Sequence, residues 1–296
     1  MSRQLRLLCL VALSLVTLSH VTTVTAACLD PVPLRLAQIP LKDSAEQARQ
    51  MQPLIAHLES RLGRQVSFHT ALSYGAVVEG LLAGSYDVAE LGPAAYADAV
   101  ARGAPIEAFA AFAGPRGIVF DTRAGYHSAL VVARDSGLTR AGLQGKALAL
   151  TDPDSTSGAL LPQRMAPALL GSPLTEYFGT IHFVGSHARA IAAVQNGLVD
   201  AAFVSTTQID NAIRAGTLAP DALHVLWQSE PMPLDPWVVH RQLCPEVAAA
   251  LREAFLNPGP TLQPWLERMG RPDGYRVVDD THYAAIRAAY ERHVSR

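Results

Sequence analysis

The sequence has few charged residues and no cluster of basic ones. Lys, Arg, Asp and Glu together make up 17% of its 296 residues, and the formal net charge at pH 7 is −2. Proteins that bind nucleic acids need a basic face that neutralises phosphates, so we expect no nucleic-acid partner. Apolar residues make up 49% of the chain, which is enough for a sizeable core and excludes a disordered or fibrous protein.

The sequence also lacks the local motifs of several enzyme classes. It contains no G-x-S-x-G of serine hydrolases, no H-E-x-x-H of zinc peptidases, and neither G-x-x-x-x-G-K-[ST] nor G-x-G-x-x-G, the loops that bind nucleotide phosphates. His182 and His187 are five residues apart across a predicted strand-to-helix turn, which makes them weak metal ligands. We therefore expect no enzymatic activity, no metal and no cofactor.

Only one long apolar run is present, and it lies at the N-terminus. Arg3 and Arg6 precede the apolar residues 7–16, and residues 24–26, Val-Thr-Ala, fit a cleavage site. This pattern predicts a secretory signal peptide over residues 1–26, too short and too polar at its far end for a membrane span. Its removal takes away two arginines and no acidic residue, so the exported chain of about 270 residues would carry a formal charge of −4.

Cysteine is scarce, with three residues in the whole chain. Cys9 belongs to the predicted signal peptide, which leaves Cys28 and Cys244. An even number of cysteines in an oxidising compartment favours a disulfide, which would tie the start of the exported chain to its C-terminal quarter. Two alternatives stay open: a lipid on Cys28, although Thr25 stands where such a signal normally has Leu, or two unpaired core cysteines.

Strand-like and helix-like segments alternate along the exported chain. An apolar stripe predicts a helix from Ser44 to Gly63, with Ser44 as the N-cap and Gln47 completing a capping box. Alternation of this kind indicates an α/β fold with largely parallel sheets. The strands are expected at residues 33–39, 65–70, 87–91, 106–112, 127–134, 148–151, 181–184 and 200–204, and further helices at 76–82 and 187–195.

One helix–glycine–strand unit occurs twice in the sequence. It begins at Tyr74 and again at His187, an offset of 113 residues, with a glycine ten residues later and an aspartate thirteen residues later in both copies. The match indicates two lobes of similar construction, although such units also resemble one another by chance. Ligands of open α/β sheets bind at the carboxyl ends of strands, so Tyr74 and His187 would lie there, one in each lobe.

The segment 152–158, DPDSTSG, gives the strongest local indication of a binding site. It follows a predicted buried strand and opens a helix, and Ser155, Thr156 and Ser157 supply three hydroxyls. The free N–H groups of a helix start and the positive end of its dipole favour an anion. The loop has no Lys or Arg, but neutral donors alone can hold a buried oxyanion. The alternative is an ordinary helix cap.

Several segments together resemble the phosphate/phosphite/phosphonate-binding proteins of ABC importers, the PhnD-like family. They are YGAVVEGLLAG followed by DVAELGPAAYADA, KALALTDPDSTSGALLP, VGSHARAIAAVQNGLVDAA and EPMPLDPWVV, in the order and spacing of the family between about residues 32 and 240. The resemblance implies a type II periplasmic binding protein fold, in which two α/β lobes clamp a ligand. Residues 28–124 plus 232–296 would form lobe 1, and residues 125–231 would form lobe 2.

The resemblance also implies a ligand site made of hydroxyls, one imidazole and one carboxylate: Tyr74, Tyr96, Ser155, Thr156, Ser157, His187 and Asp235. The Ser-Thr-Ser loop would bind phosphonate-type oxygens, the tyrosines would donate hydroxyls from the first lobe, and the histidine would close over the anion from the second. Three of these residues have structural alternatives: Tyr96 as a core residue, His187 as a helix start and Asp235 as a turn residue.

Two departures from the family pattern bear on the ligand. Ala188 stands where the family often has an acid, and no carboxylate lies near 206–208, where binders of aminoalkylphosphonates are expected to hold the amine. Both favour phosphite, phosphate or methylphosphonate, with Thr206 and Thr207 as further candidate contacts. Asp235 could accept a proton from a P–OH group, whereas a fully ionised phosphate would face an unpaired carboxylate.

These observations predict a periplasmic solute-binding protein that closes around a small phosphorus oxyanion by hinge motion. It would work as a monomer and deliver the ligand to an ABC permease in the inner membrane. The main alternative is an exported sensor of the same fold that signals to a membrane kinase, which the absence of a kinase domain disfavours. A third is an enzyme on the same fold.

Overall fold

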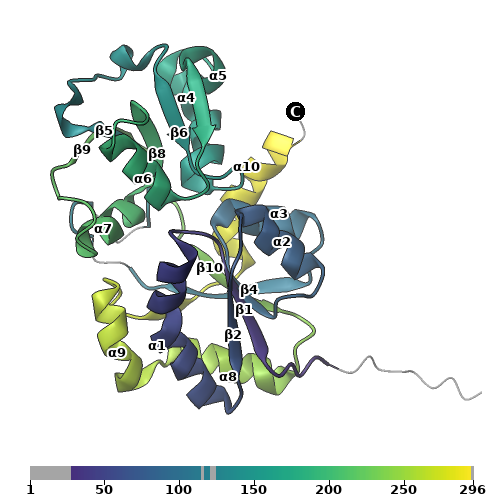
Figure 1. Ribbon diagram of the computed structural model, residues 1–296. Coiled ribbons are helices and arrows are strands. Elements are labelled where there is room, and N and C mark those ends of the chain that lie inside the picture. Colours follow the sequence, from purple (N-terminus) through teal and green to yellow (C-terminus); the bar gives the residue numbers. More distant parts are fainter. Residues whose placement is uncertain (1–27, 115–116, 121–124, 295–296) are drawn as a thin grey trace, which may run out of the picture.

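The computed structural model describes residues 28–114, 117–120 and 125–294, and the predicted signal peptide lies outside these ranges. Two separate sheets, each flanked by helices, form two lobes that meet along one side (Figure 1). In the described part of the chain, no helix is both long enough and apolar enough to cross a membrane. The predicted α/β architecture is therefore present.

The first lobe is built on a six-stranded sheet. Its strand order is β11-β4-β10-β3-β1-β2, with β1 (Leu34–Gln38), β2 (Val66–Thr70), β3 (Val88–Glu90), β4 (Ile106–Phe112), β10 (Pro236–His240) and β11 (Tyr275–Val277). Its helices are α1 (Ser44–Leu62), α2 (Tyr74–Leu82), α3 (Pro93–Ala101), α8 (Pro245–Leu256), α9 (Gly259–Arg268) and α10 (Ala284–Val294), the last preceded by a 3₁₀ turn, Asp280–Tyr283.

The second lobe is built on a five-stranded sheet. Its order is β7-β6-β8-β5-β9, with β5 (Ser128–Ala133), β6 (Ala147–Leu150), β7 (Thr180–Phe183), β8 (Ala201–Ser205) and β9 (Leu223–Gln228). Its helices are a π-helical turn (Thr156–Leu160), α4 (Leu161–Leu170), α5 (Leu174–Tyr177), α6 (His187–Gln195) and α7 (Thr206–Arg214), with short 3₁₀ turns at Arg134–Ser136 and Ala141–Leu143.

Both sheets are mixed, so the expectation of largely parallel sheets was wrong. In the first sheet β1 pairs in parallel with β2 and β3, but β10 is antiparallel to β3 and β4. In the second, β6 pairs in parallel with β7 and β8, but β5 is antiparallel to β8 and β9. The reason is the crossing of the chain: β5 and β10 are the first strands after it passes from one lobe to the other, and each enters its sheet from the opposite end.

The repeated unit of the sequence has the same structure in both lobes. Helices α2 and α6 each span nine residues at an offset of 113, as do α3 and α7, and Gly84 and Gly197 both end the first helix of their pair with a positive φ. Asp87 and Asp200 each accept an N–H near the start of a neighbouring strand, β1 or β6, at 2.8 Å. An aspartate at the equivalent position therefore stabilises the same turn in each lobe.

Apolar side chains cover both faces of each sheet. In the first lobe, α1, α8 and α9 pack on one face, while α2 and α3 pack on the other with Tyr283. In the second lobe, α6 and α7 cover one face and α4 and α5 the other. Each lobe thus has its own core, which allows the lobes to move as units about the segments that join them.

A disulfide joins Cys28 to Cys244, as the cysteine count predicted. Cys244 is the N-cap residue of α8, and the chain next to Cys28 forms a bridge between Leu29 and Leu243. Both cysteines lie in the first lobe, but the 216 residues that separate them in sequence include the whole second lobe. The bond holds the N-terminal segment of the described chain against α8.

The start of α1 differs from the expectation by one residue. Asp43, not Ser44, is the N-cap, and its carboxylate accepts the N–H groups of Ala45 and Glu46. Gln47 does not complete a capping box: it is buried, and its amide donates to the side chain of Gln38 at 2.7 Å. The predicted end of this helix at Gly63 is confirmed by a left-handed φ of 62°.

Candidate functional site

The two lobes contact each other through backbone N–H groups at helix starts. The N–H of Tyr74, at the start of α2, donates to Oδ2 of Asp152 at 3.2 Å, and the N–H of Ala94, in the first turn of α3, donates to Oγ1 of Thr156 at 2.8 Å. Both acceptors belong to the second lobe, directly after β6. The structure is therefore closed, with the 152–158 loop pressed against two helix N-termini of the first lobe.

A small cavity lies between the lobes at this contact. Six of the seven residues that the family resemblance implied line it; Tyr96 does not. The walls come from both lobes and from the segments that join them: Ile39, Leu41, Tyr74, Gly92, Tyr126, Ser155, Thr156, Ser157, His187, Ser205, Gln208 and Asp235. We call this the anion cavity.

The hydroxyl loop, residues 155–157, enters the anion cavity because the chain opens its helix with a π turn. The carbonyl of Ser155 accepts the N–H of Leu160 at 2.9 Å, and its hydroxyl accepts the N–H of Gly158 at 3.1 Å. All three hydroxyl residues are almost fully buried. A side chain at Gly158 would collide with Thr151, so glycine is required for this close approach to β6.

His187 is held as a neutral donor that points into the anion cavity. The N–H of Ser205 donates to Nδ1 at 3.1 Å, so Nδ1 is an acceptor and the ring hydrogen is on Nε2. Nε2 lies 3.5 Å from the hydroxyl oxygens of both Ser155 and Ser157. Burial lowers the pKa of His187 to about 3, which keeps the imidazole neutral.

Two tyrosine hydroxyls complete the polar wall of the anion cavity. Burial raises the pKa of Tyr74 far above its ordinary value, with a further contribution from Asp235, while the hydroxyl of Ser155 lowers it. Burial likewise raises the pKa of Tyr126, which faces the hydroxyls of Thr156 and Ser157. Both phenols therefore stay protonated, and each can donate a hydrogen bond to a ligand.

Tyr126 is one of the lining residues that the sequence did not reveal; the polar Ser205 and Gln208 are others. Tyr126 lies in the first crossing segment and pairs with Met232 of the second through two backbone hydrogen bonds, of 3.0 and 2.7 Å. No motif or periodic pattern marks this position. A glycine precedes it: Gly125 has a φ of 145°, a backbone conformation that residues with a side chain rarely adopt.

Asp235 lies where the second crossing segment enters β10, and its carboxyl lines the anion cavity. Burial raises its pKa well above the ordinary value, and the nearby Glu90 adds to the rise, whereas Arg271 opposes it. The carboxyl group therefore tends to retain a proton. A protonated Asp235 can donate a hydrogen bond to an oxyanion, and an ionised one can accept from a P–OH group.

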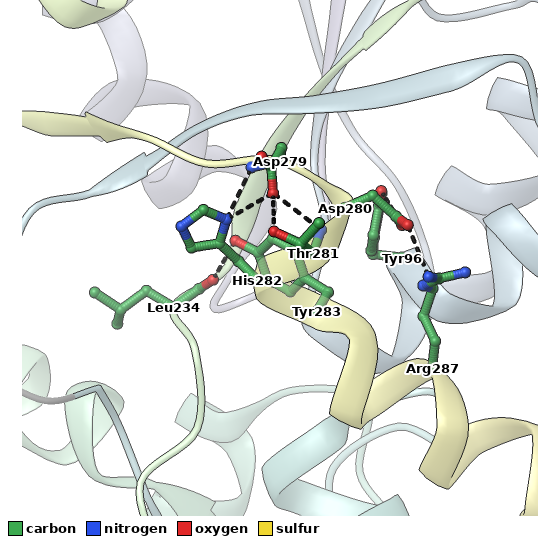
Figure 2. Close-up of polar contacts among 8 residues, drawn as sticks. All are labelled: Tyr96, Leu234, Asp279, Asp280, Thr281, His282, Tyr283 and Arg287. Atoms are coloured by element: carbon green, nitrogen blue, oxygen red, sulfur yellow. Dashed lines mark hydrogen bonds and ion pairs between the residues drawn. The ribbon is translucent and has the colours of Figure 1, made fainter.

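Tyr96 is placed elsewhere: its hydroxyl donates to Asp280 at 3.0 Å (Figure 2). Its ring packs edge-on against Tyr283, with ring centroids 5.1 Å apart. Tyr283 in turn donates to the carbonyl of Leu234, the residue before Asp235, at 2.9 Å. In this structure Tyr96 therefore anchors the C-terminal turn, and that turn holds the segment that carries Asp235.

Thr206 and Thr207 have intramolecular partners at the start of α7. Oγ1 of Thr206 accepts the N–H of His127 at 3.0 Å, which fixes the first crossing segment to the second lobe. The hydroxyl of Thr207 pairs with that of Ser205 at 2.8 Å. Neither threonine lines the anion cavity; Thr207 faces a larger neighbouring cavity.

The electrostatics of the anion cavity come from dipoles and neutral donors. The starts of α2, α3, α6 and the π turn all lie at its wall, and no Lys or Arg is among the described residues that line it. Helix N-termini carry partial positive charge and free N–H groups, which favour an anion without a formal cation. No cluster of three metal-ligating side chains occurs in the described ranges.

Comparison with known proteins agrees with this geometry. Residues 36–283 match the family model described as "ABC transporter, phosphonate, periplasmic substrate-binding protein". The phosphate-import protein PhnD of Mycolicibacterium smegmatis is 30% identical over 275 residues, which cover 86% of this chain and 81% of that protein. The phosphonates-binding periplasmic protein of Escherichia coli is 29% identical over 248 residues, which cover 80% and 70%.

Solved structures show the same fold. A binding-protein component of an ABC phosphonate transporter from Pseudomonas aeruginosa has a TM-score of 0.78 at 24% identity, covering 88% of this chain and 86% of that one. PhnD1 of Prochlorococcus marinus, in complex with methylphosphonate, has a TM-score of 0.74 at 17% identity, covering 88% and 98%. The expected type II periplasmic binding protein fold is confirmed.

Proposed function

The chain belongs to the family of periplasmic substrate-binding proteins of ABC phosphonate transporters, and from this premise we propose that it captures phosphite, phosphate or a small alkylphosphonate for import. The family consists of binding components rather than enzymes, in line with the missing catalytic motifs. The substrate class is the small phosphorus oxyanion, the class that the relatives' names share as phosphate and phosphonate.

One observation carries the proposal: six hydrogen-bond donors face one cavity that has no lysine or arginine in its wall. The donors are the hydroxyls of Tyr74, Tyr126, Ser155, Thr156 and Ser157 and the Nε2–H of His187. A tetrahedral oxyanion presents several oxygens in different directions, each with lone pairs for such donors. Hydrogen bonds to an ionised acceptor are about twice as strong as neutral ones, so the array is suited to an anion.

Asp235 would set the protonation state of the ligand. Its pKa is raised mainly by burial, so near neutral pH it can share a proton with a bound monoanion. When Asp235 is ionised, a phosphorus monoanion can donate its P–OH to the carboxylate, whereas a fully ionised oxyanion such as sulfate offers no proton and adds a second negative charge. We therefore expect discrimination against sulfate although its shape matches that of phosphate.

Capture would proceed by hinge closure. Lobe 1, residues 28–124 and 232–296, and lobe 2, residues 125–231, would separate about the paired crossing segments at Tyr126 and Met232. The bonds from Tyr74 to Asp152 and from Ala94 to Thr156 form across the gap only when it is closed. Closure removes water from the anion and strengthens its hydrogen bonds.

The closed form would then deliver its ligand to an ABC permease in the inner membrane. The signal peptide predicted over residues 1–26 would bring the chain into the periplasm, and the protein would act as a monomer. The disulfide between Cys28 and Cys244 fits an oxidising compartment.

Thermal melting of ligand-stripped protein tests the proposal. Phosphite, phosphate, hypophosphite, methylphosphonate and 2-aminoethylphosphonate are added separately, with sulfate as the control of the same shape. A ligand at 100 times its Kd should stabilise the protein by about 2.7 kcal/mol, which raises Tm by several degrees. Absence of a shift with all five phosphorus compounds, or an equal shift with sulfate, would refute the proposed ligand class.

A further inference from the structure

A second cavity adjoins the anion cavity and has no assigned occupant. It is larger than the anion cavity. The two share Leu41, Tyr126, Gln208 and Asp235 in their walls, so they lie next to each other. We call the larger one the side cavity.

The floor of the side cavity is a polar cluster of the first lobe. Glu90 and Arg271 are 4% and 6% exposed, and both line the cavity. The amide of Gln38 donates to Oε2 of Glu90, and the amide of Gln47 donates to Oε1 of Gln38 at 2.7 Å. This relay fixes one oxygen of Glu90 and leaves the other for a further donor.

Buried donors in the same floor are unpartnered. Nε and Nη1 of Arg271 and Nε1 of Trp237 have no hydrogen-bond partner among the described residues. Trp237 is 1% exposed and also lines the side cavity. Buried polar groups are nearly always satisfied in folded proteins, so three such donors beside one cavity indicate that a polar occupant completes the cluster.

The charges around the side cavity are close to balance. Glu90 and Asp235 oppose Arg271, and Lys42 lies at the same wall. Burial raises the pKa of Glu90 to about 7 and also that of Asp235, so the pair retains a proton near neutrality. A further cation would therefore have no free anionic partner in this buried setting, and an anion would have only the partly buried Lys42.

The wall also contains apolar side chains, among them Phe112, Met51 and Trp265, together with uncharged polar ones: Gln50, Thr207, Gln208 and Asn211. Phe112 also lies under the guanidinium of Arg271, 5.0 Å from the ring centroid to Cζ. An occupant must therefore present carbon to the apolar side chains and hydrogen-bonding atoms to the floor. A hydroxyl group both donates and accepts, which matches a floor that holds free carboxyl oxygens and unpartnered N–H groups.

We propose that the side cavity receives a short, uncharged, hydroxyl-bearing substituent on the phosphorus of the ligand. This inference rests on the proposed function and narrows its substrate class. The phosphonate group would occupy the anion cavity, and the substituent would pass Asp235 and reach Glu90. Hydroxyalkylphosphonates are the simplest compounds of this kind.

Isothermal titration of the full mature chain with four probes tests the inference: methylphosphonate, 2-hydroxyethylphosphonate, 2-aminoethylphosphonate and phosphonoacetate. We expect the hydroxyethyl compound to bind at least tenfold more tightly than methylphosphonate, because only it completes the buried cluster. Equal or tighter binding of methylphosphonate, or tightest binding of the amino or carboxyl compound, would overturn the inference. Failure of all four to bind, while phosphite or phosphate binds, would overturn the inference and leave the proposed function standing. Failure of phosphite and phosphate as well would refute the proposed function.

The variant Glu90→Gln tests the role of the floor. It should reduce the preference for the hydroxyethyl over the methyl compound from at least tenfold to less than threefold. Glu79→Gln, on the exposed face of α2 in the same lobe, is the matched control and should leave the preference unchanged. An undiminished preference in Glu90→Gln would remove Glu90 from the site. If that variant does not fold, the four-probe titration of the unmodified chain still decides the matter.

Discussion

The two lobes share a construction but differ in how they use their helix starts. After the first strand of lobe 1, α1 begins at Asp43, whose carboxylate occupies the N–H groups of the first turn. After the corresponding strand of lobe 2, the helix begins at Ser155, whose neutral hydroxyl caps the turn while two more hydroxyls follow. A carboxylate repels an anion from a helix start and a hydroxyl admits one. In our proposal, this difference in one cap residue separates a structural turn from a ligand-binding turn.

The second pair of equivalent positions does not show this division. Tyr74 and His187 both open a helix, after Ser73 and Ser186, which cap the two helices in the same extended conformation. Both side chains reach the anion cavity, but one donates a phenol hydrogen and the other an imidazole hydrogen. The repeated backbone therefore places two different donors, one from each lobe, in the wall of the same cavity.

The largest expected effect comes from removing the hydroxyls of the binding turn. Ser155→Ala with Thr156→Ala should weaken methylphosphonate binding at least 1,000-fold, about 4 kcal/mol, because two charge-assisted hydrogen bonds are lost in a buried site. The Tm of the ligand-free protein should fall by only a few degrees, the cost of a lost cap. Isothermal titration and melting measure the two effects.

Asp43→Ala is the matched control for that pair, since it removes the cap at the equivalent turn of lobe 1. It should lower the free energy of unfolding by about 1 kcal/mol and leave methylphosphonate affinity unchanged. Loss of affinity in Asp43→Ala comparable to that of the double variant would abolish the distinction between the two turns.

A smaller effect concerns the pH dependence of His187. Its folded pKa of about 3 lies below the unfolded value of about 6.5, so the unfolded state binds the extra proton as pH falls. This residue should therefore reduce the stability of the ligand-free protein by about 2 kcal/mol between pH 7 and pH 5. The loss should be absent in His187→Gln.

Urea unfolding of the unmodified chain and of His187→Gln at both pH values measures that difference. Comparison of the two proteins cancels the titration of Glu90 and Asp235, whose raised pKa values act in the opposite direction. The same pH dependence in both proteins would show that His187 is not a buried neutral side chain.

The smallest expected effects separate the tyrosines of lobe 1. Tyr74→Phe should weaken methylphosphonate binding about tenfold, since it removes one donor from the anion cavity. Tyr96→Phe should change the affinity less than threefold, because the hydroxyl of Tyr96 is engaged with Asp280. Isothermal titration of both variants gives the ranking. An equal or greater loss of affinity in Tyr96→Phe would show that the hydroxyl of Tyr96 contacts the ligand.

Local patterns predicted much of the fold. The stripe of α1, its glycine end and the repeated unit at Tyr74 and His187 depend on residues that are close in sequence, where periodicity and turn chemistry decide the structure. The mixed pairing of the sheets was missed because the direction of β5 and β10 depends on how the chain crosses between lobes.

The candidate site was predictable at Ser155, where it coincides with the turn between a strand and a helix. It was not predictable where segments distant in sequence meet. Tyr96 and Asp280 are 184 residues apart, so no local pattern shows that the hydroxyl has this partner. Tyr126 lies in an irregular crossing segment, and the cluster of Glu90 with Arg271 joins β3 to the turn after α9. Tertiary packing alone brings these side chains to the cavities.

A crystal structure of the mature chain with methylphosphonate would test the central claim most directly. The account predicts the phosphonate between the lobes, with its oxygens about 2.7–3.1 Å from the hydroxyls of Ser155, Thr156 and Ser157 and from Nε2 of His187. A phosphonate bound instead at a surface lysine or arginine, with the anion cavity filled by water, would contradict it.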